Sequence, residues 1–269
     1  MIDFTFKDTY DFDDLVEITR ILRAPGGCMW DREQDHHSIR RNFLEEAYEA
    51  VEAIDNEDPE LLREELGDVL FQVTFHAQIE REEGRFTVNE VIDGICKKMI
   101  YRHPHVFGTV EVASTGEVLQ NWDELKKTEK HQESAADTLR AVARSLPQLI
   151  RADKVQSKAA KTGFEWPNIE GAFAKLHEEL DELERAAAGD GDPAEELGDL
   201  LFAAVKAARF LKVDPEEALE RTTDKFISRF AAVEDGAAQQ GRTLGEMTVD
   251  EMMALWNAAK AAGKGGEEA

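Results

Sequence analysis

The sequence contains an internal repeat of two acidic, helix-like segments, and this repeat limits the possible folds more than any other feature. Each copy has the same segments in the same order: EEAYEAVEAI (45–54) with EELGDVLF (64–71), and EELDELERAA (178–187) with EELGDLLF (195–202). A glycine followed by a tryptophan precedes each copy, in GGCMWD (26–31) and TGFEWPN (162–168). Such a repeat predicts two homologous halves built on one plan.

Apolar residues recur at helical spacing in both segments of the first copy. They are Phe43, Ala47, Ala50, Val51 and Ile54 in residues 43–54, and Leu62, Leu66, Val69, Leu70, Val73 and Ala77 in residues 61–77. Asp58-Pro59 and Asp192-Pro193 each place a capping residue before a proline suited to the first helical position. No window alternates apolar and polar residues as a half-buried strand does. We therefore predict an all-α chain.

The polar segment KTEKHQESAADT (127–138) lacks apolar periodicity, so we predict a linker there. We expect two homologous helical-bundle domains, 1–130 and 138–269, on either side of it. The length of 269 residues is sufficient for each half to have its own core.

Charge and composition restrict the partners. Asp and Glu outnumber Lys and Arg by 57 to 32, a balance that opposes binding of a nucleic acid polymer. A small phosphate compound can still bind where a divalent metal lies between carboxylate and phosphate. The sequence has no run near the ~20 apolar residues of a membrane span. It has no signal-peptide pattern at its start and only two cysteines. We expect a cytoplasmic protein without membrane spans or disulfides.

Each copy of the repeat carries four carboxylates that share one edge of a helical face. Glu46 and Glu49 are three residues apart on the first segment, and Glu65 and Asp68 occupy the matching edge of the second. If the two segments pack antiparallel, the four side chains converge. The second copy repeats them as Glu179, Glu182, Glu196 and Asp199. Converging carboxylates with hard oxygen donors predict a Mg²⁺ site, with Mn²⁺ as a second possibility.

A single quartet could equally be a solvated helix surface, because acidic residues are abundant in this chain. The recurrence of the same downstream residues in the same order favours a functional site. Lys98, Arg102, Trp122 and Lys126 follow the first quartet, and Lys225, Arg229, Trp256 and Lys260 follow the second.

The residue types indicate phosphate chemistry. Metal ions on the carboxylates would hold triphosphate oxygens and lower the pKa of a bound water that attacks the triphosphate. A spare carboxylate, Glu178 or its counterpart Glu45, would position or deprotonate that water. Lys225 and Arg229 would contact phosphate oxygens that the metal does not hold. Trp256 would offer its face to a nucleotide base with Lys260 nearby, although a terminal-helix Trp can also be a core residue.

The pattern EE-x-x-E, a gap, then E-x-x-D resembles the signature of the MazG family of all-α nucleoside triphosphate pyrophosphohydrolases. It stands here as EEAYE with EELGD and as EELDE with EELGD. The segments LRAPGGCMWDREQDHHSI and RHPHVFG (102–108) are also similar to stretches of that family, although Met29 replaces a usual proline. The resemblance covers nearly the whole chain, in the two-domain arrangement of full-length members.

The resemblance implies cleavage of NTPs between the α and β phosphates, to NMP and pyrophosphate. It also implies two Mg²⁺ ions per site, broad tolerance of ATP and other NTPs, and a homodimer. The metal ligands that it implies are Glu179, Glu182, Glu196 and Asp199. The nucleotide contacts that it implies are Lys175, Lys225, Arg229 and Trp256.

One departure distinguishes the halves. Lys175 lies four residues before Glu179, whereas Asn42 holds the matching place before Glu46. The first half also has Phe71 and Phe75 outside its main apolar stripe, which we interpret as a second apolar face suited to burial in a dimer. We therefore rank the C-terminal site ahead of the N-terminal one as the catalyst.

Two other classes of protein remain open. A ferritin-like di-iron protein also uses inward carboxylates, but it needs Glu-x-x-His on two helices, and the tetrad from Glu33 to His36 has no repeat. A non-catalytic scaffold or regulatory protein with relic sites is the second, although a relic need not keep two intact ligand sets. The histidines His36, His37, His103 and His105 do not recur in the repeat, so we expect loop or core roles for them.

Overall fold

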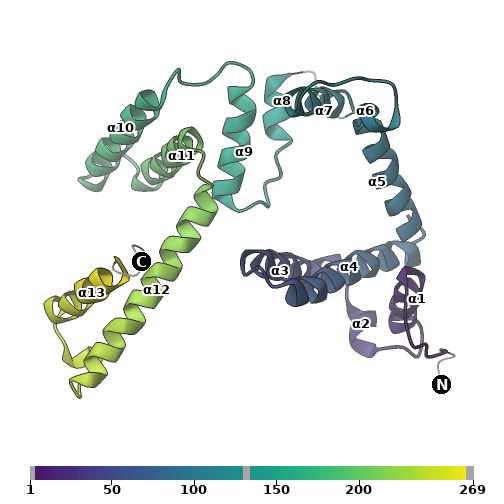
Figure 1. Cartoon of the computed structure of the whole chain (residues 1–269), viewed down its shortest axis with the longest axis horizontal. Helices are drawn as coiled ribbons and strands as arrows, with labels where there is room; N and C mark the ends of the chain where they lie inside the picture. The colour runs from purple at the N-terminus through teal and green to yellow at the C-terminus, as the bar shows by residue number, and fades with distance from the viewer. Residues whose placement is uncertain (1–3, 130–133, 265–269) are drawn as a thin grey trace. The chain divides into compact units, whose positions relative to one another are not determined.

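The computed structural model describes residues 4–129 and 134–264, and this part of the chain is helical without strands. The predicted all-α class is confirmed. The chain divides into two compact units, residues 1–126 and 127–269 (Figure 1). Each unit contains one copy of the sequence repeat, and the limits of the two predicted domains remain a prediction.

Unit 1 is built around a hairpin of two long helices. Its helices are α1 (Phe12–Arg23), α2 (Met29–Glu33), α3 (His36–Asp55), α4 (Pro59–Glu82), α5 (Val88–Arg102), α6 (Pro104–Phe107) and α7 (Thr115–Glu129), which continues past the unit boundary. Helices α3 and α4 pack along each other, and α1 and α5 also contact α4.

Side-chain caps explain where the hairpin helices begin. Asp58 accepts hydrogen bonds from the backbone N–H groups of Glu60 and Leu61, and Pro59 occupies the first turn of α4, as predicted. Asp35 caps α3 in the same way and forms a capping box with Ser38, so this helix starts seven residues before its apolar stripe at Phe43.

The core of unit 1 lies where α3, α4 and α1 meet. Ile39, Phe75 and Ile79 are buried together with Phe71 packed against them. The hydroxyl groups of Thr19 and Thr74 lie 3.1 Å apart and join α1 to α4. The prediction that Phe71 and Phe75 form a second face for a dimer is wrong, because Phe75 is only 3% exposed inside its own unit.

The predicted apolar stripe of the hairpin is only partly a core. Ala50 is buried, but Val51 and Ile54 on α3 and Leu66 and Leu70 on α4 are 40–57% exposed. The stripe is wider than the contact between two helices, so its outer part remains uncovered in unit 1.

Unit 2 repeats the hairpin. Its helices are α8 (Ala135–Arg140), α9 (Gln148–Ala160), α10 (Ile169–Ala187), α11 (Pro193–Leu211), α12 (Pro215–Gln239) and α13 (Val249–Lys264), with a 3₁₀ turn at Leu244–Glu246. Helices α10 and α11 form the hairpin, α9 packs on α11 and α12, and α12 pairs with α13. Asp192 caps α11 with Pro193 behind it, as predicted.

The predicted linker is partly helical. Helix α7 extends to Glu129, and Ser134 caps α8 by accepting a hydrogen bond from the backbone N–H of Asp137. Polar composition concealed this short helix, because its start depends on a cap rather than on apolar periodicity. Residues 130–133 of the predicted linker lie outside the described residues. No helix in the described ranges is long and apolar enough to cross a membrane.

Candidate metal centres

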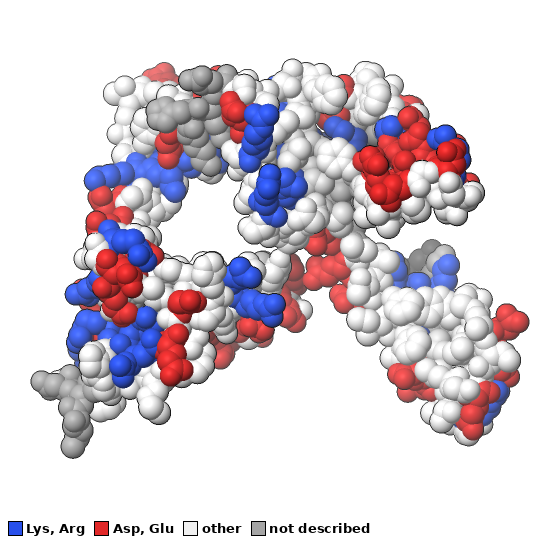
Figure 2. Space-filling model, turned by 180° about the vertical axis from the view of Figure 1, so that it is seen from behind, with Lys and Arg blue, Asp and Glu red and all other residues white. Residues whose placement is uncertain are grey.

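The hairpin of unit 2 brings three of its four predicted ligands together. Carboxylate oxygens of Glu179 on α10 and of Glu196 and Asp199 on α11 lie within 4.8 Å of one another. Glu179 is buried, with only 4% of its surface exposed. Acidic side chains gather visibly over α10 and α11, at the upper right of Figure 2. We refer to these three residues as the α10–α11 cluster.

Unit 1 gathers an equivalent group. Oxygens of Glu46 and Glu49 on α3 and of Glu65 on α4 lie within 4.8 Å of one another, and we refer to them as the α3–α4 cluster. The fourth predicted ligand, Asp68, is outside this group, but its negative charge acts on both Glu46 and Glu65. The antiparallel packing that the sequence suggested therefore does bring carboxylates from both helices together.

Burial and the neighbouring carboxylates both raise the pKa of acidic groups in the two clusters. Burial raises the pKa of Glu46 above its usual value, and the negative charges of Asp68 and Glu49 raise it further. Burial and then Glu182 raise the pKa of Glu196 in the same direction. The part of both shifts that comes from neighbouring carboxylates reflects negative charge close by, and a bound divalent cation would offset that charge. Clustered carboxylate oxygens fit Mg²⁺ or Mn²⁺.

The two clusters differ in their neighbouring cations. In unit 2 the Lys175 Nζ lies 2.6 Å from Oε1 of Glu179 and 2.9 Å from Oε1 of Glu178. These contacts raise the pKa of Lys175, so this ammonium group stays charged. The fourth predicted ligand, Glu182, pairs with Arg185 at 3.0 Å and is not part of the α10–α11 cluster.

In unit 1 a neutral amide takes the corresponding role. Gln72, which is buried, hydrogen-bonds with Glu46 and lowers its pKa against the larger raising effects. Asn42 and Glu52 stand where unit 2 has Lys175 and Arg185. Glu52 adds a further negative charge near Glu65.

Apart from Lys175 on α10, the predicted nucleotide contacts of unit 2 lie on the second hairpin, α12–α13. The Arg229 guanidinium stacks over the Trp256 ring at 5.8 Å, and the Phe226 ring lies 5.1 Å from the same Trp. Trp256 is half-buried, so it contributes to hairpin packing while part of it remains exposed. Lys225 and Lys260 are exposed. Among the described residues, neither Lys225 nor Arg229 forms an ion pair with the α10–α11 cluster.

In unit 1 the counterpart tryptophan, Trp122, also has a cation over its ring, although from a different residue. The Lys126 Nζ lies 4.3 Å from the Trp122 ring centroid, and the ring of His103 packs on the same Trp. Arg102 is buried and Lys98 is half-buried. The Trp–Lys pairing that the sequence suggested therefore forms within α7 of unit 1.

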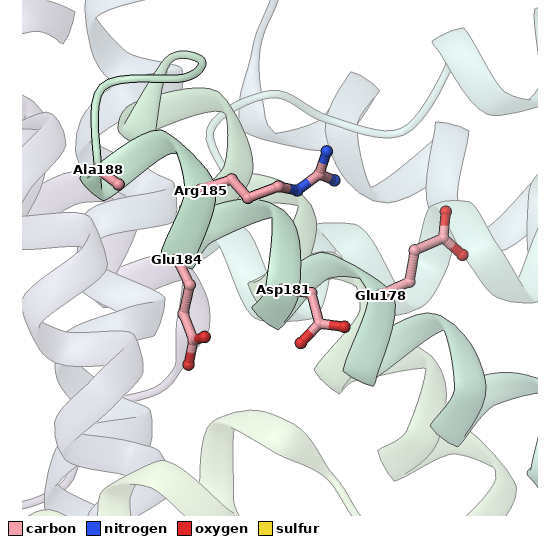
Figure 3. A pocket seen from close by; sticks show the side chains of 5 residues that line it. All are labelled: Glu178, Asp181, Glu184, Arg185 and Ala188. Atoms are coloured by element: carbon pink, nitrogen blue, oxygen red, sulfur yellow. The ribbon is translucent and has the colours of Figure 1, made fainter.

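Glu178, the predicted general base, is adjacent to the predicted ligand Glu179 on α10 but is not part of the α10–α11 cluster. Figure 3 shows it with Asp181, Glu184, Arg185 and Ala188 along one open surface depression of this helix. None of the four predicted ligands lines this depression. Glu178 reaches the cluster through Lys175, which bonds to Glu178 and Glu179 together.

Sequence reasoning missed three features of the two hairpins. Arg185 and Gln72 were identifiable from spacing, because each lies one helical turn after a predicted ligand, Glu182 and Asp68 respectively. A third group joins residues far apart in sequence, on the consecutive helices α3 and α4. The Nδ1 atoms of His36 and His76 are 2.7 Å apart, and His36 Nε2 lies 2.6 Å from Glu80. No spacing rule could have joined these histidines.

Two helical hairpins, each with clustered carboxylates, define an all-α protein with two candidate divalent-metal centres. Comparison with known proteins agrees with this class. The family described as MazG nucleotide pyrophosphohydrolase domain matches residues 34–107 and 168–233, which contain both hairpins. The chain belongs to the MazG family.

Individual relatives extend the match over almost the whole chain. The nucleoside triphosphate pyrophosphohydrolase/pyrophosphatase MazG of Thermotoga maritima is 42% identical over 96% of this chain and 97% of its own length. A nucleoside triphosphate pyrophosphohydrolase of Escherichia coli is 40% identical over 92% of this chain and 96% of its own. The uncharacterized protein YabN of Bacillus subtilis is 46% identical over 93% of this chain, which covers 52% of YabN.

Proposed function

We propose that this protein is a Mg²⁺-dependent nucleoside triphosphate pyrophosphohydrolase that converts NTPs to NMP and pyrophosphate. Family membership supports the class of enzyme, a hydrolase of nucleoside triphosphates. The observation that carries the proposal for this chain is the α10–α11 cluster, with three carboxylates within 4.8 Å and an ammonium group beside them. Such a site suits a metal-bridged polyphosphate rather than an organic anion alone.

Each predicted site residue of unit 2 has a separate role in this proposal. Glu179, Glu182, Glu196 and Asp199 would hold Mg²⁺, which when bound neutralises phosphate charge and acidifies water. Lys175, Lys225 and Arg229 would bind the remaining phosphate oxygens, and Trp256 would stack on the base. Glu178 would orient or deprotonate the attacking water. Unit 1 has the carboxylates but lacks the counterpart of Lys175, so we place turnover in unit 2.

The experiment that tests the proposal is product analysis. We expect the purified protein with an NTP and Mg²⁺ or Mn²⁺ to release NMP and pyrophosphate, which ³¹P NMR distinguishes from NDP and orthophosphate. Excess EDTA should stop the reaction. Orthophosphate as the primary product, or full activity in EDTA, would contradict the proposal.

We also propose that the protein is a homodimer. Both hairpins expose matching apolar side chains beside their metal ligands: Leu66 and Leu70 on α4, and Leu197 and Leu201 on α11, each 40–54% exposed. A second copy could cover these faces and bring further basic side chains to the α10–α11 cluster. Light scattering should give twice the mass of one chain, and a monomer at micromolar concentration would exclude the dimer. Cytoplasmic localisation remains a prediction.

A further inference from the structure

The α10–α11 hairpin carries its own cations one helical turn from its acidic ligands. Lys175 contacts both Glu178 and Glu179, and Arg185 contacts Glu182. Glu179 is almost fully buried, so the ammonium group of Lys175 is the counter-charge nearest to it. These ion pairs occupy oxygens of two of the four carboxylates that would bind a metal ion.

The α3–α4 hairpin shows the opposite arrangement at the matching positions. Asn42 replaces Lys175, and Glu52 replaces Arg185. Among the described residues, no Lys or Arg forms an ion pair with Glu46, Glu49 or Glu65. The hydrogen bond from Gln72 to Glu46 is neutral and leaves the full negative charge in place. The two clusters therefore have similar ligands but different built-in cations.

This difference has a direct consequence for metal binding. Two cations that need the same carboxylate oxygen compete, so a divalent ion must displace Lys175 to use all of Glu179. The Lys175 side chain is 39% exposed and has a flexible stem, so it can leave without unpacking the hairpin. Once displaced from Glu179, the ammonium group keeps Glu178 as its anionic partner, and a triphosphate supplies a second one.

We propose that the Lys175–Glu179 ion pair prevents divalent ions from binding fully to the α10–α11 cluster until a triphosphate binds, whereas the α3–α4 cluster binds an ion without nucleotide. Metal and triphosphate then bind cooperatively in unit 2 and independently in unit 1. By thermodynamic linkage each of the two ligands strengthens the other equally. Lys175 thus couples the binding of metal and substrate, an inference that rests on the proposed function.

The test measures Mn²⁺ binding directly, by electron paramagnetic resonance of the free ion, with no turnover. The full-length chain carries Glu46→Gln and Glu49→Gln to silence the α3–α4 cluster, and is compared with the same chain carrying Lys175→Gln. Without nucleotide, we expect Lys175→Gln to bind Mn²⁺ about three- to thirtyfold more tightly, because a competing cation is gone. A non-hydrolysable α,β-methylene NTP analogue should raise the affinity more in the chain that keeps Lys175.

A reciprocal exchange provides the matched control. In a chain with Glu179→Gln and Asp199→Asn, which silence the α10–α11 cluster, Asn42→Lys should weaken Mn²⁺ binding at the α3–α4 cluster by a similar factor. This arm does not depend on the folding of any Lys175 variant. A helical circular dichroism spectrum that matches the wild type shows that each variant is folded.

The outcomes separate the inference from the proposed function. Equal Mn²⁺ affinities with and without Lys175, while Mn²⁺ still binds, overturn the coupling and leave the metal site intact. An Asn42→Lys chain with unchanged affinity also overturns it. If no chain binds Mn²⁺, with or without the analogue, the metal-dependent function fails and the inference fails with it.

Discussion

Trp256 has two neighbours that restrict how it could hold a base. Phe226 and the guanidinium group of Arg229 both pack against its ring, and part of the ring stays exposed at the α12–α13 contact. A base that stacks there would do so in the ground state and in the transition state alike, so the interaction would affect binding more than the chemical step.

We therefore predict that Trp256→Ala raises KM about tenfold with a smaller effect on kcat, since stacking on an aromatic ring contributes about 1–3 kcal/mol. Steady-state kinetics of the variant test this. Trp30→Ala is the control, because Trp30 is exposed in unit 1 and outside both clusters. An unchanged KM in a folded Trp256→Ala protein would show that Trp256 packs within the hairpin and does not bind the base.

A second residue-scale prediction concerns pH. Burial lowers the pKa of His76 below its usual value of 6.5, and the neighbouring His36 lowers it further. The unfolded chain then binds more protons than the folded one below about pH 6.5, so the free energy of unfolding falls as pH falls through the folded pKa. Around this pair, Glu80 also contacts Arg85, and together Arg85 and His36 hold the pKa of Glu80 near 2, so Glu80 remains ionised throughout this window.

Urea unfolding between pH 7.5 and 5.5 measures this effect. The wild-type protein should lose stability more steeply toward pH 5.5 than His76→Gln, which keeps a hydrogen-bonding side chain that does not titrate. Parallel pH profiles of the two proteins would show that His76 does not contribute.

At the scale of the elements, helix starts were predictable and helix faces only partly so. Asp58-Pro59 and Asp192-Pro193 start α4 and α11 because a cap and a first-turn proline act locally. The exposure of Val51 and Ile54 was not predictable, because it depends on which helix lies opposite. The repeated carboxylates were also predictable, because their spacing of three residues is a local property of each helix. The His36–His76 pair was not, because it depends on the packing of α3 against α4.

The loop after α1 has no room for a side chain at Gly27. A Cβ on Gly27, which follows α1, would lie 2.3 Å from the backbone oxygen of Ile21, so the chain must shift to admit it. We expect Gly27→Ala to destabilise unit 1 by about 1–3 kcal/mol.

The matched control is Gly94→Ala, because a Cβ at this position in α5 meets no atom within 4 Å. That change should stabilise the protein by about 0.5–1 kcal/mol, since alanine favours a helix interior over glycine. Thermal unfolding of both variants tests the pair, and a Gly27→Ala protein as stable as the wild type would contradict the close approach.

At the scale of the whole molecule, the repeat corresponds to two units that share one hairpin but differ in the cations beside their carboxylates. The sequence identified both sets of carboxylates and the exchange of Lys175 for Asn42. It could not tell that Lys175 bonds to Glu179, because a lysine at this spacing can equally extend into solvent. The partners of the basic side chains on α12 and α13 also depend on tertiary contacts rather than on local pattern.

The central claim is that the α10–α11 cluster of unit 2 carries out NTP hydrolysis. The most direct measurement is the rate of pyrophosphate release by Glu179→Gln and by Glu46→Gln, each of which removes a ligand charge at nearly constant volume. We predict that Glu179→Gln abolishes most turnover and Glu46→Gln retains most of it, with circular dichroism confirming that both remain folded. A larger loss in Glu46→Gln would assign catalysis to unit 1, and equal partial losses would mean that both units work.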